Sequence, residues 1–191
     1  MHAMFRRATG IAAALAGGAA VFAAPAKSCV CILAPPPGAS AEGPKGTVTF
    51  TQREGDARVT VRVRASGVAP GKHGFHIHAL GDLTQGCISA GGHFNPLKMS
   101  FHGGPGDFMR HAGDMGNVEA SAEGIVDATI VDDKISLDAA SDLSIVGRSC
   151  VLHADEDDLG RGFFEDSSTT GHAGARIACG VIGLAADVEV A

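Results

Sequence analysis

Short segments that alternate apolar and polar residues recur through most of this chain. The clearest are TVTFTQ at residues 47–52 and RVTVRVRA at residues 58–65, where Val59, Val61 and Val63 fall on one face of an extended strand. A period of two is typical of half-buried antiparallel strands. Five later segments continue the series: GFHIH, VEASA, IVDATIV, LSIVGRSCVLH and ACGVIGLA. No segment shows a sustained helical period, so the sequence predicts an all-β barrel or sandwich.

Two long glycine-rich insertions interrupt the predicted strands, at about residues 80–114 and 154–176. Most connections in compact domains are short, and loops of this length are usually either functional or disordered. These two insertions contain histidines and many of the acidic residues. We therefore expect both loops to be functional.

Residues Met1–Ala26 have the organisation of a secretory signal peptide. Arg6 and Arg7 give a positive start, Ile11–Ala24 form an apolar run, and the final APA offers a small-x-small cleavage pattern. The apolar run is shorter than the roughly 20 residues that a membrane-spanning helix needs. We therefore predict an exported protein, periplasmic or secreted, that does not span a membrane.

Residues 27–43 are rich in Pro, Ala, Gly and Ser and predict a mobile tether, which leaves a single domain over residues 44–191. The leader contains two of the 15 basic residues and none of the 21 acidic ones, so the mature chain carries about −8. The chain has no Trp and no Tyr, and no block of basic residues. Nucleic-acid binding is disfavoured on these grounds.

An ordered set of histidines is the strongest chemical signal in the chain. His76 and His78 are separated by one residue, so on a strand their side chains leave the same face and can hold one ion together. Further donors follow at His93, His102, His111, Asp114 and His153. Any single histidine here could be an ordinary hydrogen-bonded imidazole. Seven donors over roughly eighty residues indicate two metal ions rather than one.

Seven motifs in this order resemble those of copper/zinc superoxide dismutase. They are GFHIH (74–78), GCISAGGHFNP (86–96), HGGP (102–105), RHAGDMGN (110–117), GRSCVLH (147–153), DDLGRG (157–162) and TGHAGARIACGVIG (170–183). The resemblance covers roughly residues 44–190, and it is specific because the motifs occur in combination. It implies an eight-stranded Greek-key β-barrel with two long functional loops, and a homodimer.

The resemblance implies one copper and one zinc ion per chain. The residues that match the copper ligands are His76, His78, His93 and His153. The residues that match the zinc ligands are His93, His102, His111 and Asp114, with the His93 imidazole shared between the ions. Four imidazoles suit Cu(II), and three nitrogens with one carboxylate suit a closed, structural zinc site. Asp157 matches the carboxylate that hydrogen-bonds His76 and His102 and fixes their rings.

The activity that the resemblance implies is dismutation of superoxide to oxygen and hydrogen peroxide by a copper ion that cycles between two oxidation states. His93 is expected to leave the reduced copper and take up a proton while zinc holds the ring. Arg176 matches the residue that receives the anionic substrate beside copper, and its guanidinium is always charged. The alternative is a copper-binding or copper-transfer protein on the same fold, without turnover. In either case a copper donor is a possible partner.

Five cysteines in an exported chain are an odd number, so at least one sulfur cannot join an intrachain disulfide. Cys87 and Cys179 match the intrasubunit disulfide of the family. Cys150 is expected to be a buried free thiol. Cys29 and Cys31 have no counterpart in the family. A local disulfide, a link between chains and a copper-delivery site all remain open for them.

Two histidines of the mature chain lie outside this set of donors. His73 comes three residues before His76, and the resemblance implies a structural hydrogen bond there. His172 stands at a loop position where the family usually has Asn, and we expect an exposed imidazole.

The second loop departs from the family at positions that guide the substrate anion. Two positions that commonly carry lysines are Asp155 and Thr169 here, whereas the acidic Glu165 and Asp166 are kept. An anion that approaches an acidic protein depends on local positive potential. We therefore expect turnover that is slower than is usual in the family, or that responds weakly to salt.

Overall fold

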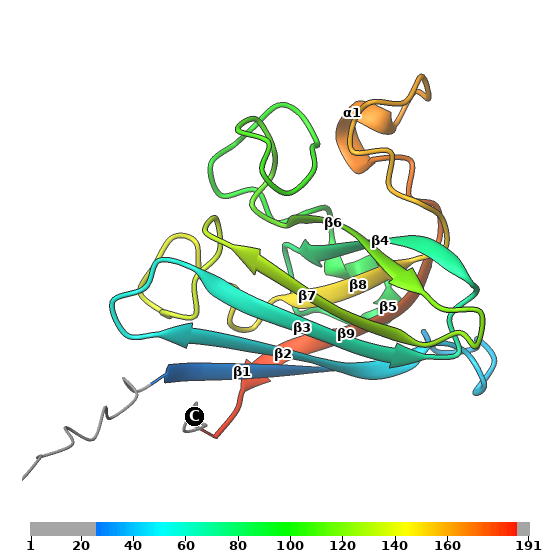
Figure 1. The fold of residues 1–191 in the computed structure, drawn as a ribbon, viewed down its shortest axis with the longest axis horizontal. Coiled ribbons are helices and arrows are strands. Elements are labelled where there is room, and N and C mark those ends of the chain that lie inside the picture. Colours follow the sequence, from blue (N-terminus) through cyan, green and yellow to red (C-terminus); the bar gives the residue numbers. More distant parts are fainter. Residues whose placement is uncertain (1–25, 187–191) are drawn as a thin grey trace, which may run out of the picture.

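The computed structural model describes residues 26–186 of the chain. Eight antiparallel strands close into one barrel in the order β1, β2, β3, β7, β6, β4, β8, β9 (Figure 1). Their bounds are β1 Ala26–Leu33, β2 Lys45–Arg53, β3 Val59–Ser66, β4 Gly71–His78, β6 Asp114–Ala120, β7 Val126–Asp132, β8 Ser149–His153 and β9 Arg176–Leu184. β3 pairs with β7 and not with β4, and β4 lies between β6 and β8. Some strands that follow one another in the chain are therefore not neighbours in the barrel, as in a Greek key. The predicted eight-stranded Greek-key barrel is confirmed.

Short elements outside the barrel lie in the two long loops. Strand β5 (Thr84–Cys87) and the 3-10 helix η1 (Ile88–Ala90) belong to the first loop, and helix α1 (Ser167–Thr170) belongs to the second. Figure 1 shows both loops, in green and in orange, on the same side of the barrel. Within residues 26–186, no helix has the length and apolar character needed to cross a membrane.

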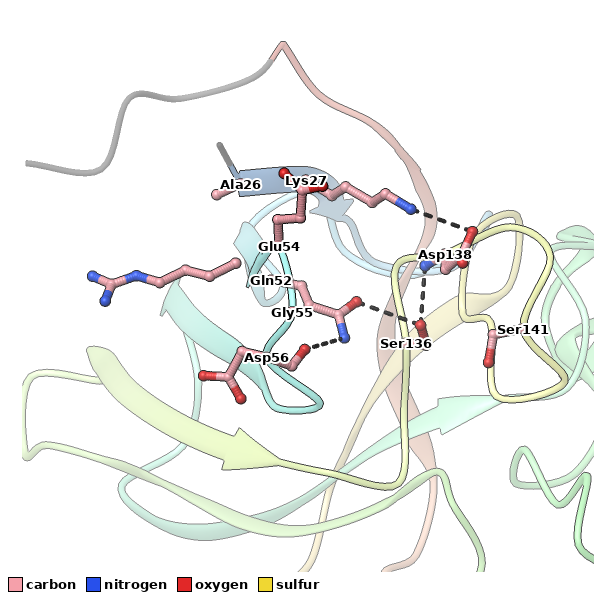
Figure 2. A pocket seen from close by; sticks show the side chains of 10 residues that line it. Ala26, Lys27, Gln52, Glu54, Gly55, Asp56, Ser136, Asp138 and Ser141 are labelled. Carbon is pink, nitrogen blue, oxygen red and sulfur yellow. Dashed lines mark hydrogen bonds and ion pairs between the residues drawn. The ribbon is translucent and has the colours of Figure 1, made fainter. Parts of the chain in front are cut away.

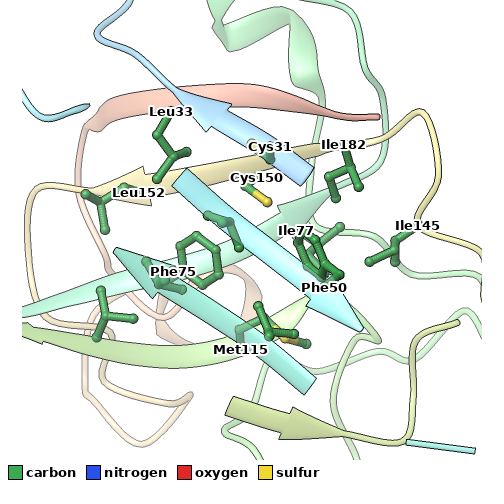
Figure 3. Close-up of a cluster of buried hydrophobic side chains, with 14 of the residues drawn as sticks. Cys31, Leu33, Phe50, Phe75, Ile77, Met115, Ile145, Cys150, Leu152 and Ile182 are labelled. Carbon is green, nitrogen blue, oxygen red and sulfur yellow. The ribbon is translucent and has the colours of Figure 1, made fainter. Parts of the chain in front are cut away.

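The apolar and polar residues that alternate in the sequence are alternately buried and exposed in the structure. On β3, Val59, Val61 and Val63 are fully buried, whereas Arg62 and Arg64 point to solvent. Inward side chains from all eight barrel strands form one apolar core, part of which is shown in Figure 3. Burying one such side chain contributes about 1.5–3 kcal/mol, so the barrel is stabilised mainly by this core.

The tether prediction is wrong for its first part, because that segment forms strand β1 of the barrel. β1 pairs with β2 along its whole length and with β9 near its centre. The inward positions of β1 include Cys29 and Cys31, whereas the inward positions of β2 and β3 carry Val and Phe. The composition of β1 therefore does not identify it as a strand. Only residues 34–44 connect β1 to β2. The predicted signal peptide falls almost wholly on residues 1–25, which lie outside the described residues.

The cysteines divide into one disulfide and three buried thiols. Cys87 and Cys179 form a disulfide that links β5 to β9, with their Cα atoms 5.6 Å apart and a sequence separation of 92. On the chain-entropy model, a disulfide that closes a loop of this size stabilises the folded protein by on the order of 4–5 kcal/mol. Cys150 is a buried free thiol, as expected. Cys29 and Cys31 are also free and buried, so they form no local disulfide; Figure 3 shows Cys31 in the core.

Candidate metal centre

Strand β4 distributes its side chains onto two faces. Phe75 and Ile77 belong to the barrel core, whereas His76 and His78 point to the outer face. All four side chains are fully buried, because the two long loops cover that outer face. The H-x-H spacing therefore places two imidazoles in the space between the barrel and the loops.

Backbone hydrogen bonds fasten the first loop to β4 beside these histidines. The Ile77 N–H donates to the Gly113 carbonyl (2.9 Å), and the Phe94 N–H donates to the Ile77 carbonyl (2.8 Å). The Gly113 N–H donates in turn to the Phe94 carbonyl (2.9 Å). A Cβ atom on Gly113 would lie 2.1 Å from the Ile77 oxygen, so only glycine permits this approach. The contacts bring the adjacent His93 and Asp114 to the histidines of β4.

Four histidines form a first group at the outer face of β4. The members of this first group are His76, His78, His93 and His153, and each offers a ring nitrogen within 4.8 Å of the others. One nitrogen of each ring has a hydrogen-bond partner. His76 pairs with the Asp157 carboxylate (2.8 Å) and His93 with the Asp114 carboxylate (2.7 Å). His78 pairs with the Gly91 carbonyl (2.8 Å) and His153 with the Gly174 carbonyl (3.1 Å). The second nitrogen of each ring is buried without a partner: Nδ1 of His76 and Nε2 of His78, His93 and His153. Buried polar atoms are rarely left unpaired, so this set fits a bound metal ion.

Burial keeps the first group neutral. It lowers the pKa of His78 to about 2 and the pKa of His153 to about 4. It also lowers the pKa of His76 and of His93. A neutral imidazole has the free lone pair that binding to a metal requires. Protons therefore do not compete with a metal for this group at neutral pH.

A second group surrounds the carboxylate of Asp114. The Nδ1 atoms of His93, His102 and His111 lie 2.7, 3.0 and 3.1 Å from Asp114 Oδ1. The other oxygen, Oδ2, accepts the backbone N–H groups of His111 (2.8 Å) and Gly103 (3.1 Å). Three nitrogens and one carboxylate oxygen are the donor set of a closed zinc site. His93 belongs to both groups, through Nδ1 here and through Nε2 in the first.

The charges of the second group are strongly coupled. Burial alone would raise the pKa of Asp114, but hydrogen bonds from His102, His111 and His93 hold it well below its ordinary range. Burial alone would lower the pKa of His102, but Asp114 and Asp157 raise it to about 9. His102 therefore carries a proton at neutral pH in the metal-free protein, and a metal ion must displace that proton.

Asp157 lies between the two groups. Its carboxylate accepts hydrogen bonds from Nε2 of His76 (2.8 Å) and Nε2 of His102 (2.8 Å). Its backbone N–H donates to the side chain of Asn117 (2.8 Å), which fixes its position. Gly171 closes over it, since a Cβ atom there would lie 1.9 Å from Asp157 Oδ1. This placement lets one carboxylate orient a ring of each group, as the sequence predicted.

A buried arginine supports the second group, although the sequence pattern does not reveal it. Arg110 pairs with Asp132 at the end of β7, and both side chains are 2% exposed. Its guanidinium also donates to the carbonyl oxygens of His111 (3.1 Å), Ala112 (3.4 Å) and Asp114 (3.2 Å). The arginine therefore fixes the backbone that carries two members of the second group. The sequence signal is its place at the start of the RHAGDMGN motif, directly before His111, and that place does not show its burial or its partner.

A cavity of about 290 Å³ leads to the first group. His78, His93 and His153 line it together with Arg176. The Arg176 guanidinium donates to the Cys87 carbonyl (2.7 Å), so the disulfide loop positions it. A fixed guanidinium beside the imidazole rings that line the cavity suits the binding of a small anion.

Two larger cavities each have a volume of about 580 Å³. One of them lies beside the start of β1 and is shown in Figure 2. Several of its polar groups pair with one another or with the backbone: Lys27 pairs with Asp138 (3.3 Å), and the Gln52 amide donates to the Asp56 carbonyl (3.0 Å). The other lies beside the disulfide. No histidine lines either cavity, so neither is the candidate metal centre.

The two remaining histidines have separate surroundings. His73 is buried, and its ring nitrogens face the carbonyl oxygens of His153 (3.0 Å) and Ala69 (2.7 Å), which confirms the structural hydrogen bonding. The His172 side chain is 46% exposed, as expected from the sequence. It also hydrogen-bonds Asp166 in the second loop (2.7 Å).

Fold and site together define a β-barrel protein with two adjoining groups of residues that could each hold a metal ion and that share one imidazole. In a comparison with known protein families, the family of copper/zinc superoxide dismutase (SODC) matches residues 44–182, which is more than half of the chain. Among solved structures, that of the clock protein EA4 is 43% identical with a TM-score of 0.75, and the match covers 83% of this chain and 94% of that one. The chain belongs to the copper/zinc superoxide dismutase family.

Proposed function

We propose that the protein catalyses the dismutation of superoxide to oxygen and hydrogen peroxide, with one copper and one zinc ion per chain. The observation that carries this proposal is the set of four buried, unpartnered ring nitrogens in the first group. The other nitrogen of each ring already has a hydrogen-bond partner, so each ring is oriented for a metal ion. Membership of the family supports the same conclusion.

The residues present fit both metals. The first group would hold copper through its unpartnered nitrogens, on His76, His78, His93 and His153. The second would hold zinc through the donors of His93, His102, His111 and Asp114. Bound copper would supply a one-electron couple, through which one superoxide anion is oxidised to oxygen and another is reduced to hydrogen peroxide.

His93 is placed to hold a proton for the second half of the reaction. Its Nδ1 lies 2.7 Å from Asp114 in the second group, while its Nε2 faces the first group. With Nδ1 retained by the second group, Nε2 can take up one proton and deliver it to the reduced anion, and solvent supplies the second proton of hydrogen peroxide. Arg176, at the wall of the cavity, binds the incoming anion by charge and hydrogen bonding.

The alternative is a protein that binds or transfers copper without turnover. The clock protein EA4 has the same fold at 43% identity, so the fold alone does not establish turnover. Loss of ligands or of the anion-binding arginine would favour that alternative. Here both ligand groups are complete and Arg176 lines the cavity, which favours catalysis.

The test is to load the purified protein with copper and zinc and to measure metal content and superoxide consumption by pulse radiolysis. We expect about one ion of each metal per chain and rapid consumption. His153→Gln is the matched variant, because it removes one nitrogen of the first group and leaves the second intact. It should lose copper and activity but keep zinc. Full metal content without consumption of superoxide would support the alternative.

We also propose a homodimer, as the family resemblance implies. Ile32 on β1 and Leu184 on β9 are 63% and 77% exposed, and Val181 on β9 is 43% exposed. The two strands are neighbours in the barrel, and exposed apolar patches often mark interfaces. Sedimentation velocity should show a dimer, and Leu184→Asp should shift it to the monomer. A monomeric wild-type protein at micromolar concentration would contradict the proposal.

Export and delivery of copper by a donor protein are further proposals from the sequence. The predicted leader ends at Ala26, which is also the first residue of β1. N-terminal sequencing of the mature protein from its host tests the cleavage. A mature chain that still begins at Met1 would contradict export by a cleaved signal peptide.

A further inference from the structure

The cavity over the first group contains two opposed charges. Besides histidines, its charged lining residues are Arg176 and Asp166. Asp166 is the residue that precedes helix α1 in the second loop. The guanidinium attracts a small anion and the carboxylate repels it, and both act over the same small space. Anion entry therefore depends on how Asp166 is paired.

Asp166 is paired with His172. The His172 Nδ1–H donates to Asp166 Oδ1 at 2.7 Å, and the Thr170 hydroxyl donates to Oδ2 at 3.3 Å. The His172 ring also stacks on Phe164, with ring centroids 3.7 Å apart and planes 8° from parallel. The hydrogen bond from His172 is the main reason that the pKa of Asp166 is lowered. The carboxylate is therefore ionised, and it accepts a hydrogen bond from this imidazole.

The loop backbone places His172 for this contact. Its φ angle is +51°, in the left-handed region that His, Asn and Asp adopt more readily than most residues. The stack fixes the plane of the ring, and the hydrogen bond fixes Nδ1 toward Asp166. The other nitrogen makes no hydrogen bond within residues 26–186, and the side chain is 46% exposed. The imidazole can therefore exchange a proton with solvent.

We propose that protonated His172 neutralises Asp166 and thereby makes the cavity over the first group attractive to small anions. The inference rests on the proposed function, because superoxide is such an anion. His172 is a positioning residue that acts through Asp166 and does not touch the reacting atoms. It supplies a cation in a loop where Asp155 and Thr169 provide none. Lower pH favours the protonated, positively charged form of an imidazole, so anion binding should strengthen as the pH falls.

Other charged groups face this pair from the neighbouring segments. A Cβ atom on Gly174 would lie 1.9 Å from the Asp155 carboxylate, so that carboxylate lies against the same loop. Gly171, directly before His172, lies against Asp157 and His102. The remaining charged or titratable neighbours are Glu165, Arg176, His78, His93 and His153. Carboxylates ordinarily keep their charge above pH 5 and arginine throughout, and bound metals would occupy the ligand histidines. His172 is therefore the residue to which the proposal assigns the variable charge.

Azide, a small anion that binds Cu(II), is a suitable probe because its binding requires no turnover. Its affinity for the copper- and zinc-loaded protein is read from the visible absorption spectrum. His172→Asn tolerates the positive φ angle and cannot become charged. At low ionic strength and about pH 6, this variant should bind azide roughly two- to threefold more weakly than wild type. At about pH 8.5, or in about 0.5 M salt, the difference should disappear.

Two further variants separate charge from structure. His172→Lys carries a cation at both pH values, so it should keep the affinity seen at about pH 6 and lose the pH dependence. Asp166→Asn should raise azide affinity, and adding His172→Asn to it should have no further effect. This double variant separates the charge effect from the stacking, because only the charge effect requires Asp166 to be ionised.

Two results would overturn the inference. One is equal azide affinity in wild type and His172→Asn at about pH 6 and low salt. The other is a loss that is the same at every pH and salt concentration, which would assign a purely structural role to the stacked ring. If azide affinity follows the expected pattern but superoxide is not consumed, the proposed function fails and the assignment of His172 stands.

Discussion

The barrel and the two long loops of this protein are stabilised in different ways. The barrel buries apolar side chains completely, among them Phe50, Val61 and Ile77. The loops bury polar groups instead, such as Asp157 and Arg110, and they surround ring nitrogens that have no partner. Apolar burial is favourable without any ligand, whereas an unpaired buried polar atom is destabilising. Bound metals should therefore complete the structure of the loops but not that of the barrel.

Removal of both metals tests this difference most strongly. Amide hydrogen exchange in residues 102–114 should accelerate by at least about a thousandfold, because the metals stabilise only the closed loops, by about 4 kcal/mol or more. Amides of β3 should change by less than about twofold in the same experiment. Mass spectrometry of the metal-loaded and chelator-treated proteins gives both numbers. Equal acceleration in the barrel and the loops would show that the two regions unfold together.

Arg110→Met sharpens the comparison within the first loop. It leaves Asp132 buried and unpaired, so the free energy of unfolding should fall by about 3 kcal/mol. Zinc should also be lost to a chelator more readily, because the backbone of His111 and Asp114 is no longer held. The control is Arg161→Met, which breaks the exposed pair with Asp107 and should cost less than about 1 kcal/mol. Equal effects of the two variants in urea unfolding would argue against a special role for the buried pair.

The metal-free protein should be most stable near pH 6.5. As the pH falls from about 6.5 to about 4, the unfolded chain takes up protons at His78 and His153 that the folded protein excludes, so stability is lost. As the pH rises from about 6.5 to about 9, the unfolded chain releases the proton that folded His102 retains, so stability is lost again. The loss should be on the order of 3 kcal/mol per histidine in urea titrations, so it should be larger on the acid side, where two histidines contribute. Stability that is flat from pH 6.5 to 9 would show that His102 is not held protonated.

Ionic strength should have the smallest effect. Asp155 and Thr169 stand where guiding lysines are common, and Asp166 faces the cavity beside Arg176. The rate of superoxide consumption should therefore change by less than about twofold between low and physiological salt. Pulse radiolysis at several salt concentrations measures this directly. A steep fall in rate with rising salt would reveal attractive steering that these residues do not provide.

The strands with clear alternation could be predicted from the sequence, and strand β1 could not. In β3, Val alternates with Thr or Arg, which is the pattern of a half-buried strand. In β1, Cys29 and Cys31 take the inward positions, and cysteine gives no such signal beside a stretch rich in Ala and Pro. The pairing of β1 with both β2 and β9 is a tertiary property, which local sequence does not encode.

The candidate site shows the same division. The donors His76, His78 and His93 could be selected from motif and spacing, because the residue types themselves carry the chemistry. Arg110 could not, because its importance depends on burial and on a partner 22 residues away. Exposure of His172 could be predicted, but its contacts with Phe164 and Asp166 depend on the left-handed turn of the loop.

The central claim is that the His93 ring joins two different metal ions. The most direct measurement is a crystal structure of the copper- and zinc-loaded oxidised protein, with anomalous diffraction recorded at both metal edges. We predict a copper peak beside His76 and His153, a zinc peak beside Asp114, and contact of His93 with both ions. A single ion at the centre, or two ions of which only one contacts His93, would contradict the claim.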